Sequence, residues 1–140
     1  MENTALIVGA SGISGSNLAQ ELLNQNWTTY GITRSSDVDL KGLHNIKADL
    51  LDKAALETAL AEIKPTHVFF TAWMRKDTEA ENIKVNAALV RNVLEVLAPK
   101  QSVKHVALVT GLKHYLGPFD AYAQEGFLPE TPVRTEHPRL

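Results

Sequence analysis

Cysteine is absent from the 140-residue sequence, which excludes a fold held together by disulfide bonds. Continuous apolar runs are short, and none approaches the ~18 residues that a membrane-spanning helix needs. The N-terminus lacks the basic stretch and the separate apolar stretch of a secretory signal. Neither charge sign is in large excess: the net charge is −2 and the pI is about 6.2. We therefore expect neither nucleic acid nor a membrane as a partner.

The composition that remains is that of an ordinary globular protein, with 44% apolar and 21% charged residues. A chain of this size buries roughly two-thirds of its unfolded surface, which is enough for one core. Five histidines are scattered along the chain without the spacing of metal ligands. The sequence thus predicts a soluble, cytoplasmic domain with no metal site.

Apolar segments alternate with helical patterns along most of the chain. We expect strands at residues 4–8, 27–33, 45–48, 66–72 and 103–110, and helices at residues 14–25, 52–63 and 78–98. The first of these segments is apolar without alternation, which is typical of a strand buried on both faces in a parallel sheet. Regular alternation of strand and helix predicts an α/β fold with right-handed crossovers and helices on both faces of the sheet.

Apolar spacing in the helix expected at 78–98 predicts which of its faces packs on the sheet. The predicted inward stripe consists of Ile83, Ala87, Val90, Leu94 and Leu97. Three other apolar residues lie outside this stripe: Val85, Leu89 and Val96. They are a candidate surface for a second copy of the chain, as in a homodimer, or for a covering helix.

A glycine-rich turn follows the first strand, with the spacing G-x-x-G-x-x-G from Gly9 to Gly15. At this place Gly9 permits a tight turn, Gly12 lets a diphosphate approach the backbone, and Gly15 lets the helix pack close to the strand. The intervening Ser11 and Ile13 lie at the start of the helix, where exposed amides bind anions. The turn predicts a Rossmann-type, doubly wound sheet of order 3-2-1-4-5 that binds a dinucleotide, although an ordinary turn between strand and helix has the same pattern.

The end of the second strand indicates which dinucleotide is bound. An NAD site has an acidic residue here, about 20 residues past the glycines, to hold the ribose 2′-hydroxyl. This sequence has Arg34, followed by Ser35 and Ser36. A guanidinium pairs well with a 2′-phosphate, so we predict NADP(H) as the cofactor. Asp37 is near enough to leave NAD open, and the alternative interpretation of Arg34 is a solvated loop residue.

Further candidates for cofactor binding follow the other strands, at the edge where ligands of such sheets gather. Asp49 is placed to accept a hydrogen bond from an adenine amino group, although Asp49 or Asp52 as a mere helix cap is equally consistent with the sequence. The remaining candidates at this edge are Leu50, Thr71, Trp73 and Thr110. Trp73 as a core residue is the competing interpretation.

Two longer segments carry a resemblance to a known family. Residues 82–95 are similar to the long helix with an inward asparagine in extended short-chain dehydrogenases/reductases. The segment T-G-L-K-H-Y-L-G-P-F at 110–119 closely resembles a signature of the progesterone 5β-reductase and iridoid synthase-like group. Residues 135–140 resemble the stretch that precedes the active-site tyrosine of that group. The resemblance extends over the whole chain.

This resemblance implies an NADPH-dependent reductase that adds hydride to the activated C=C bond of an enone or enal. Its catalytic lysine corresponds to Lys113, and its partner tyrosine belongs to a later helix that these 140 residues do not contain. We therefore expect a dinucleotide-binding domain at 1–111 and a proline-rich active-site segment at 112–140, which leads into a C-terminal portion. The 140 residues alone are expected to be inactive.

Two other functions remain open. A nucleotide-sugar epimerase or dehydratase has the same fold, but such enzymes use Y-x-x-x-K, which none of the three tyrosines here begins. A regulator that senses NADP(H) without chemistry is the other alternative, because fold alone does not establish function. Lys113 favours the reductase, since a sensor has no need of it. The expected substrate is a small molecule with a conjugated carbonyl group.

Overall fold

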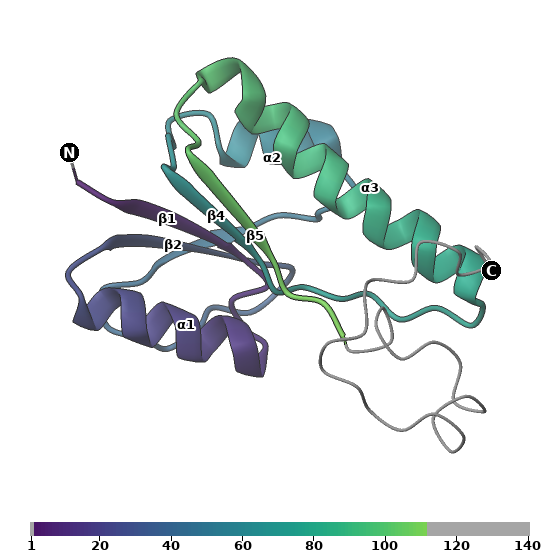
Figure 1. The fold of residues 1–140 in the computed structure, drawn as a ribbon, viewed down its shortest axis with the longest axis horizontal. Coiled ribbons are helices and arrows are strands. Elements are labelled where there is room, and N and C mark those ends of the chain that lie inside the picture. Colours follow the sequence, from purple (N-terminus) through teal and green to yellow (C-terminus); the bar gives the residue numbers. More distant parts are fainter. Residues whose placement is uncertain (1, 112–140) are drawn as a thin grey trace, which may run out of the picture. The chain divides into compact units, whose positions relative to one another are not determined.

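The computed structural model describes residues 2–111, and residues up to Leu108 form one compact unit (Figure 1). Its elements are β1 (Thr4–Val8), α1 (Ile13–Asn24), β2 (Thr28–Thr33), β3 (His44–Lys47), α2 (Lys53–Ala59), β4 (His67–Phe70), α3 (Glu79–Leu97) and β5 (His105–Leu108). A short 3₁₀ turn, η1 (Ala98–Lys100), follows α3. The predicted elements are all present: β1 has the predicted bounds, and the ends of the others are displaced by at most four residues.

All neighbouring strands pair in parallel, and their order in the sheet is β3-β2-β1-β4-β5. The predicted order is thereby confirmed. Figure 1 shows α1 on one face of the sheet and α2 with α3 on the other. This is the doubly wound arrangement of a Rossmann-type fold.

The central strand β1 is apolar without alternation because it is covered on both faces. Four of its residues, Ala5 to Val8, have no exposed surface. Leu6 and Val8 belong to the core cluster that includes residues of α2 and α3, whereas Ala5 and Ile7 belong to the cluster that includes residues of α1. Successive side chains point to opposite faces, so a strand covered on both faces must be apolar throughout.

The predicted inward stripe of α3 is partly wrong. Ile83 is 49% exposed and Ala87 is also exposed, while Val90 and Leu94 are half-buried against the core. The buried apolar residues of the helix are Leu89, Val93, Val96 and Leu97. Leu89 and Val96 therefore pack inside the protein and are not available to a second copy. The apolar contact begins only at Leu89, because the first turns of α3 face a polar loop.

Polar residues set where the helices on this face begin. The Asp52 carboxylate accepts a hydrogen bond from the Ala55 backbone N–H, 3.0 Å away, at the start of α2. At the start of α3, Thr78 and Glu81 form a reciprocal capping box. Asp52 is thus the helix cap that the sequence predicted as one alternative. Among the described residues, no helix is long and apolar enough to cross a membrane.

Candidate functional site

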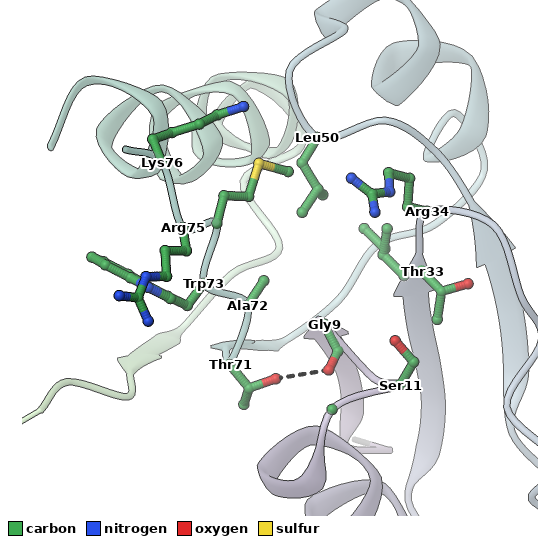
Figure 2. A pocket seen from close by; sticks show the side chains of 13 residues that line it. Gly9, Ser11, Thr33, Arg34, Leu50, Thr71, Ala72, Trp73, Arg75 and Lys76 are labelled. Carbon is green, nitrogen blue, oxygen red and sulfur yellow. Dashed lines mark hydrogen bonds between the residues drawn. The ribbon is translucent and has the colours of Figure 1, made fainter. Parts of the chain in front are cut away.

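A pocket of about 560 Å³ lies where β1, β2 and β4 end (Figure 2). Its lining combines the glycine-rich turn with the segments that follow β2, β3 and β4. The lining residues are Gly9, Ser11, Gly12, Ile32, Thr33, Arg34, Leu50, Thr71, Ala72, Trp73, Met74, Arg75 and Lys76. Ligands of open α/β sheets bind at this edge, beside the point where the strand order reverses.

Gly9 and Gly15 are required by the packing of the protein itself. Gly9 has a φ of +96°, and a Cβ there would lie 2.7 Å from the backbone nitrogen of Ala72. A Cβ on Gly15 would collide with the Gly9 carbonyl oxygen and would lie 2.8 Å from the Thr71 hydroxyl oxygen. The Thr71 hydroxyl also bridges the carbonyl oxygens of Val8 and Gly9, at 3.0 and 3.1 Å. The turn, α1 and the end of β4 are therefore packed backbone against backbone.

Gly12 is different, because the protein leaves room at its Cβ position. The nearest atom to a Cβ there is the Gly9 carbonyl oxygen at 3.6 Å, an ordinary contact distance. Its backbone angles, φ −77° and ψ 165°, are open to any residue. Gly12 lines the pocket and is the N-cap of α1. A glycine that the fold does not need, facing a pocket, indicates close approach by a ligand.

The N-terminus of α1 is suited to an anion. Gly12 offers no side-chain cap, and the first turn has no acidic residue. The first amides of a helix have no partner within the helix and carry the positive end of its dipole. By contrast, α2 and α3 have side-chain caps, and α3 has Glu79 and Glu81 in its first turn. A phosphate on the pocket side of α1 would therefore meet unoccupied N–H groups.

Arg34 is the first residue after β2 and stands across the pocket from Trp73 (Figure 2). Its neighbour Thr33 is buried, and the Thr33 hydroxyl donates a 2.6 Å hydrogen bond to the Ser36 carbonyl oxygen. This bond closes a short turn that has Arg34 and Ser35 at its tip. The turn anchors the backbone of Arg34 while its exposed side chain extends toward Leu50.

The segment after β4 is held against the first turns of α3 by two asparagines. The Asn86 side chain accepts from the Met74 N–H at 2.9 Å and donates to the Met74 carbonyl oxygen at 2.8 Å. Asn82 accepts from the Lys76 N–H at 2.6 Å. Trp73 is 65% exposed at the pocket, so its interpretation as a core residue is wrong.

The residues that line this pocket include three basic ones, Arg34, Arg75 and Lys76, and no acidic one. Figure 2 shows the Arg34 side chain extending toward Leu50, whereas the ends of Arg75 and Lys76 point away from Gly9 and Ser11. Together with the N-terminus of α1, these groups favour a ligand with several negative charges. The described residues contain no group of three or more acidic or histidine side chains that could hold a metal ion.

The structure brings together seven of the predicted site residues around the pocket: Gly9, Ser11, Gly12, Arg34, Leu50, Thr71 and Trp73. Ile13, Gly15, Ser35 and Asp49 lie nearby in the chain but do not line it, and Ile13 is 86% exposed. The Asp49 carboxylate accepts from the Leu51 N–H at 2.9 Å, within its own turn. Thr110 belongs to the second compact unit, and Lys113 lies outside the described residues.

Sequence reasoning missed several lining residues, chiefly Met74, Arg75 and Lys76. They continue the segment that was identified at Thr71 and Trp73, and two successive basic residues after a buried strand were the available signal. Thr33 was missed because it is the last residue of a predicted strand, and we took the site residues from the segment after that strand.

Comparisons with known proteins agree with this geometry. A model described as the NAD dependent epimerase/dehydratase family matches residues 5–138. A 3-oxo-Delta(4,5)-steroid 5-beta-reductase of Arabidopsis thaliana is 34% identical, and the match covers 99% of this chain and 38% of the reductase. An (S)-8-oxocitronellyl enol synthase of Nepeta racemosa is 35% identical, over 99% of this chain and 38% of the synthase. The chain thus spans about two-fifths of the length of these relatives.

Solved structures share the fold. The enzyme WbmG of Bordetella bronchiseptica, in complex with NAD and UDP, has a TM-score of 0.72 and 28% identity, over 95% of this chain and 44% of that one. A UDP-glucose 4-epimerase from Bifidobacterium longum, in complex with NAD⁺ and UDP, has a TM-score of 0.73 at 22% identity, over 94% of this chain and 42% of that one. The second likeness supports the fold alone. With the family model matching nearly the whole chain, this protein belongs to the NAD-dependent epimerase/dehydratase family.

Proposed function

We propose that this chain carries the cofactor site of an NADPH-dependent reductase that acts on the activated C=C bond of an enone or enal. The observation that carries the proposal is the pocket between Gly12 and Arg34, which has the N-terminus of α1, without a side-chain cap, at one end and a guanidinium at the other. The match to a steroid 5-beta-reductase and an enol synthase supports the choice of chemistry within the family.

The residues present fit the parts of NADPH. The diphosphate would lie on the α1 N-terminus, where the protein leaves space beside Gly12. Arg34 would pair with the 2′-phosphate, in the manner in which guanidinium groups bind phosphates. Leu50 is buried and offers an apolar wall for the adenine ring. Thr71 and Trp73 would lie toward the nicotinamide end of the pocket.

NADPH, when bound, supplies the hydride that adds to the β-carbon of the substrate. Lys113 is the residue that we propose for the other half of the reaction. A lysine ammonium beside the substrate oxygen would stabilise the negative charge that develops there during hydride addition. This role is implied by the T-G-x-K-H-Y resemblance, which pairs the lysine with a tyrosine of a later helix. A polypeptide of residues 1–140 alone is therefore expected to bind NADPH weakly and to leave enones unreduced.

The second candidate is an NAD-dependent epimerase or dehydratase. Asp37, three residues past Arg34, is the observation that favours it, because an acidic side chain near the end of β2 suits a free ribose 2′-hydroxyl. The WbmG match, at 28% identity to an enzyme solved with NAD and UDP, supports it as well. The two candidates differ in the cofactor that they require.

One pair of measurements tests the proposal. Arg34→Ala should weaken NADPH binding by about 2 kcal/mol, the scale of a lost charge-assisted hydrogen-bonded partner, and leave NADH binding almost unchanged. Arg91→Ala, which removes an exposed arginine of α3 outside the pocket, is the matched control. In the complete protein, absorbance of the reduced nicotinamide should fall when a simple enone is added, and Lys113→Ala should abolish that change. Equal losses for both cofactors, or turnover without Lys113, would contradict the proposal.

A further inference from the structure

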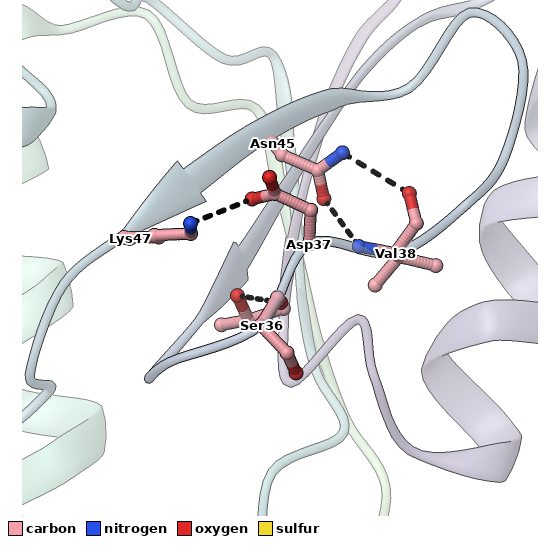
Figure 3. Close-up of polar contacts among 6 residues, drawn as sticks. Ser36, Asp37, Val38, Asn45 and Lys47 are labelled. Carbon is pink, nitrogen blue, oxygen red and sulfur yellow. Dashed lines mark hydrogen bonds and ion pairs between the residues drawn. The ribbon is translucent and has the colours of Figure 1, made fainter.

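The turn that presents Arg34 is held in place by side chains of Thr33, Asn45 and Lys47, of which Thr33 alone lines the pocket (Figure 3). Its near end is the Thr33 hydroxyl, which bonds to the Ser36 carbonyl oxygen at 2.6 Å. Its far end is Val38, which is half-buried against the core cluster beside α1. Arg34 and Ser35 are the exposed tip between these two anchors.

Asn45, on the edge strand β3, fixes the far end of the turn. Its amide oxygen accepts from the Val38 N–H at 2.9 Å, and its amide nitrogen donates to the Val38 carbonyl oxygen at 3.1 Å. The side chain thus pairs with both backbone groups of one residue, as a neighbouring strand would. Asn45 is itself set by the sheet, because it lies opposite Gly31 in the β2–β3 register.

A charge pair acts on the same turn. Lys47 lies opposite Thr33 in the register, and its ammonium is 3.4 Å from the Asp37 carboxylate. Asp37 is the one acidic residue in the segment from Arg34 to Val38. A free carboxylate beside Arg34 would attract the guanidinium and repel a phosphate. Lys47 holds that carboxylate toward β3, although both side chains are exposed and the attraction between them is modest.

We propose that Asn45 is a positioning residue for Arg34, and that Lys47 assists it by engaging Asp37, so that β3 sets the selectivity for a 2′-phosphorylated adenosine. The inference rests on the proposed function, because it concerns the same cofactor site. The selectivity device is therefore spread over two strands: β2 supplies the guanidinium, and β3 orders the backbone that carries it.

The test compares two fragments of the cofactor, adenosine 2′,5′-bisphosphate and adenosine 5′-monophosphate, whose affinities are measured by calorimetry on the full chain. The dissociation constant of the monophosphate divided by that of the bisphosphate reports recognition of the 2′-phosphate alone, and this ratio falls when that recognition is lost. Asn45→Ala should lower this ratio about five- to tenfold, the effect expected when one or two hydrogen bonds that order a loop are lost. Asn45→Ser, which keeps a hydroxyl for one of the Val38 groups, should give an intermediate ratio.

Gln20→Ala is the control, because Gln20 is an exposed residue of α1 whose side chain, among residues 2–111, bonds to Asn24 on the same helix. It should leave the ratio unchanged. Thermal unfolding confirms that each variant is folded, and if Asn45→Ala does not fold, Asn45→Ser decides. An unchanged ratio in the folded variant, or an equal loss of both affinities, would overturn the positioning role. Arg34→Ala distinguishes the choice of NADPH from the positioning role of Asn45. If Arg34→Ala also leaves the ratio unchanged, the proposed choice of NADPH is wrong. If Arg34→Ala lowers the ratio and Asn45→Ala does not, only the positioning role of Asn45 is wrong.

A double-mutant cycle tests the part of Lys47. Lys47→Met should lower the ratio by up to about fivefold, the upper range for an exposed ion pair. The loss should vanish in an Asp37→Asn background, because the carboxylate that Lys47 engages is then neutral. Lys53→Met is the matched control, since Lys53 forms a similarly exposed pair with Glu95 on the outer helices. A loss of equal size in both backgrounds would mean that Lys47 acts on the phosphate directly and would overturn its positioning role.

Discussion

Replacing Gly12 by valine is expected to abolish cofactor binding and to spare the fold, whereas the smaller change Gly15→Ala is expected to damage the fold. The backbone angles at Gly12 are open to valine, and the first added carbon meets only the Gly9 carbonyl oxygen at 3.6 Å. A branched residue is a poorer N-cap than glycine, so we expect a cost of about 1 kcal/mol. For a domain of this size that lowers the melting temperature by about 4 °C.

Gly15→Ala has no such freedom. Its Cβ would collide with the Gly9 carbonyl oxygen, which is already engaged by the Gly12 N–H at 3.2 Å and the Thr71 hydroxyl at 3.1 Å. Helix α1 must then move away from β1, and overpacking of this kind costs about 1–3 kcal/mol or more. Gly12→Val should therefore lower the free energy of unfolding less than Gly15→Ala does, although valine is the larger side chain.

The binding effect of Gly12→Val follows from where the side chain stands. It would occupy the space in front of the α1 amides and displace a diphosphate from them. Loss of two charge-assisted hydrogen bonds, at about 1.5 kcal/mol or more each, corresponds to at least about a hundredfold weaker binding. Calorimetry with NADPH and thermal unfolding on the same samples measure both quantities. A folded Gly12→Val variant with unchanged affinity for NADPH would show that the turn is structural only.

Two other residues give further tests. Asn86→Ala removes both bonds to the Met74 backbone, so the free energy of unfolding measured with urea should fall by about 2 kcal/mol, and an unchanged value would mean that α3 does not hold this loop. Burial, together with the nearby charges of His105 and Lys104, lowers the pKa of His67, so the folded state favours its neutral form. The free energy of unfolding should therefore decrease as the pH falls below about 6.5, where unfolded His67 takes up a proton. His67→Phe should flatten this dependence in denaturant titrations, and an unaltered slope would assign it to other groups.

The sheet was predictable because its strands carry a strong physical signal. A strand buried on both faces must be apolar throughout, and β1 has that pattern together with a glycine at the end where the chain turns. Each strand is followed by a helix or a long connection, which leaves parallel pairing as the simplest solution. The two layers of helices followed from these facts, whereas the strand order came from the glycine-rich turn, which is typical of a Rossmann-type sheet.

The inward face of α3 was less predictable, because the helix has two different neighbours. From Leu89 onward it packs on the apolar core, and helical spacing identifies that face. Its first turns instead hold the loop after β4 through Asn82 and Asn86, which a search for apolar residues passes over. The prediction of one apolar stripe that begins at Ile83 was wrong because it treated these two surfaces of α3 as one.

Some residues of the site could be identified from the sequence, and others only from the structure. Arg34 could be found from its distance to the glycine turn and from its charge. Asn45 could not, because its partner Val38 is a plain apolar residue seven positions away and their bond joins a side chain to a backbone. The residue type of the partner does not reveal a bond from a side chain to the backbone, because every residue except proline has the same backbone N–H and C=O groups.

The three glycines of the turn show why a motif predicts a site without explaining it. The sequence does not distinguish the three glycines. In the structure, Gly9 has a positive φ and Gly15 lies in close contact with the backbone of the turn, whereas Gly12 has neither property. A turn that served packing alone would need the first two and would accept a side chain at the third. Packing in the described part of the chain therefore does not require a glycine at position 12, whereas a phosphate close to the backbone at the N-terminus of α1 would require one.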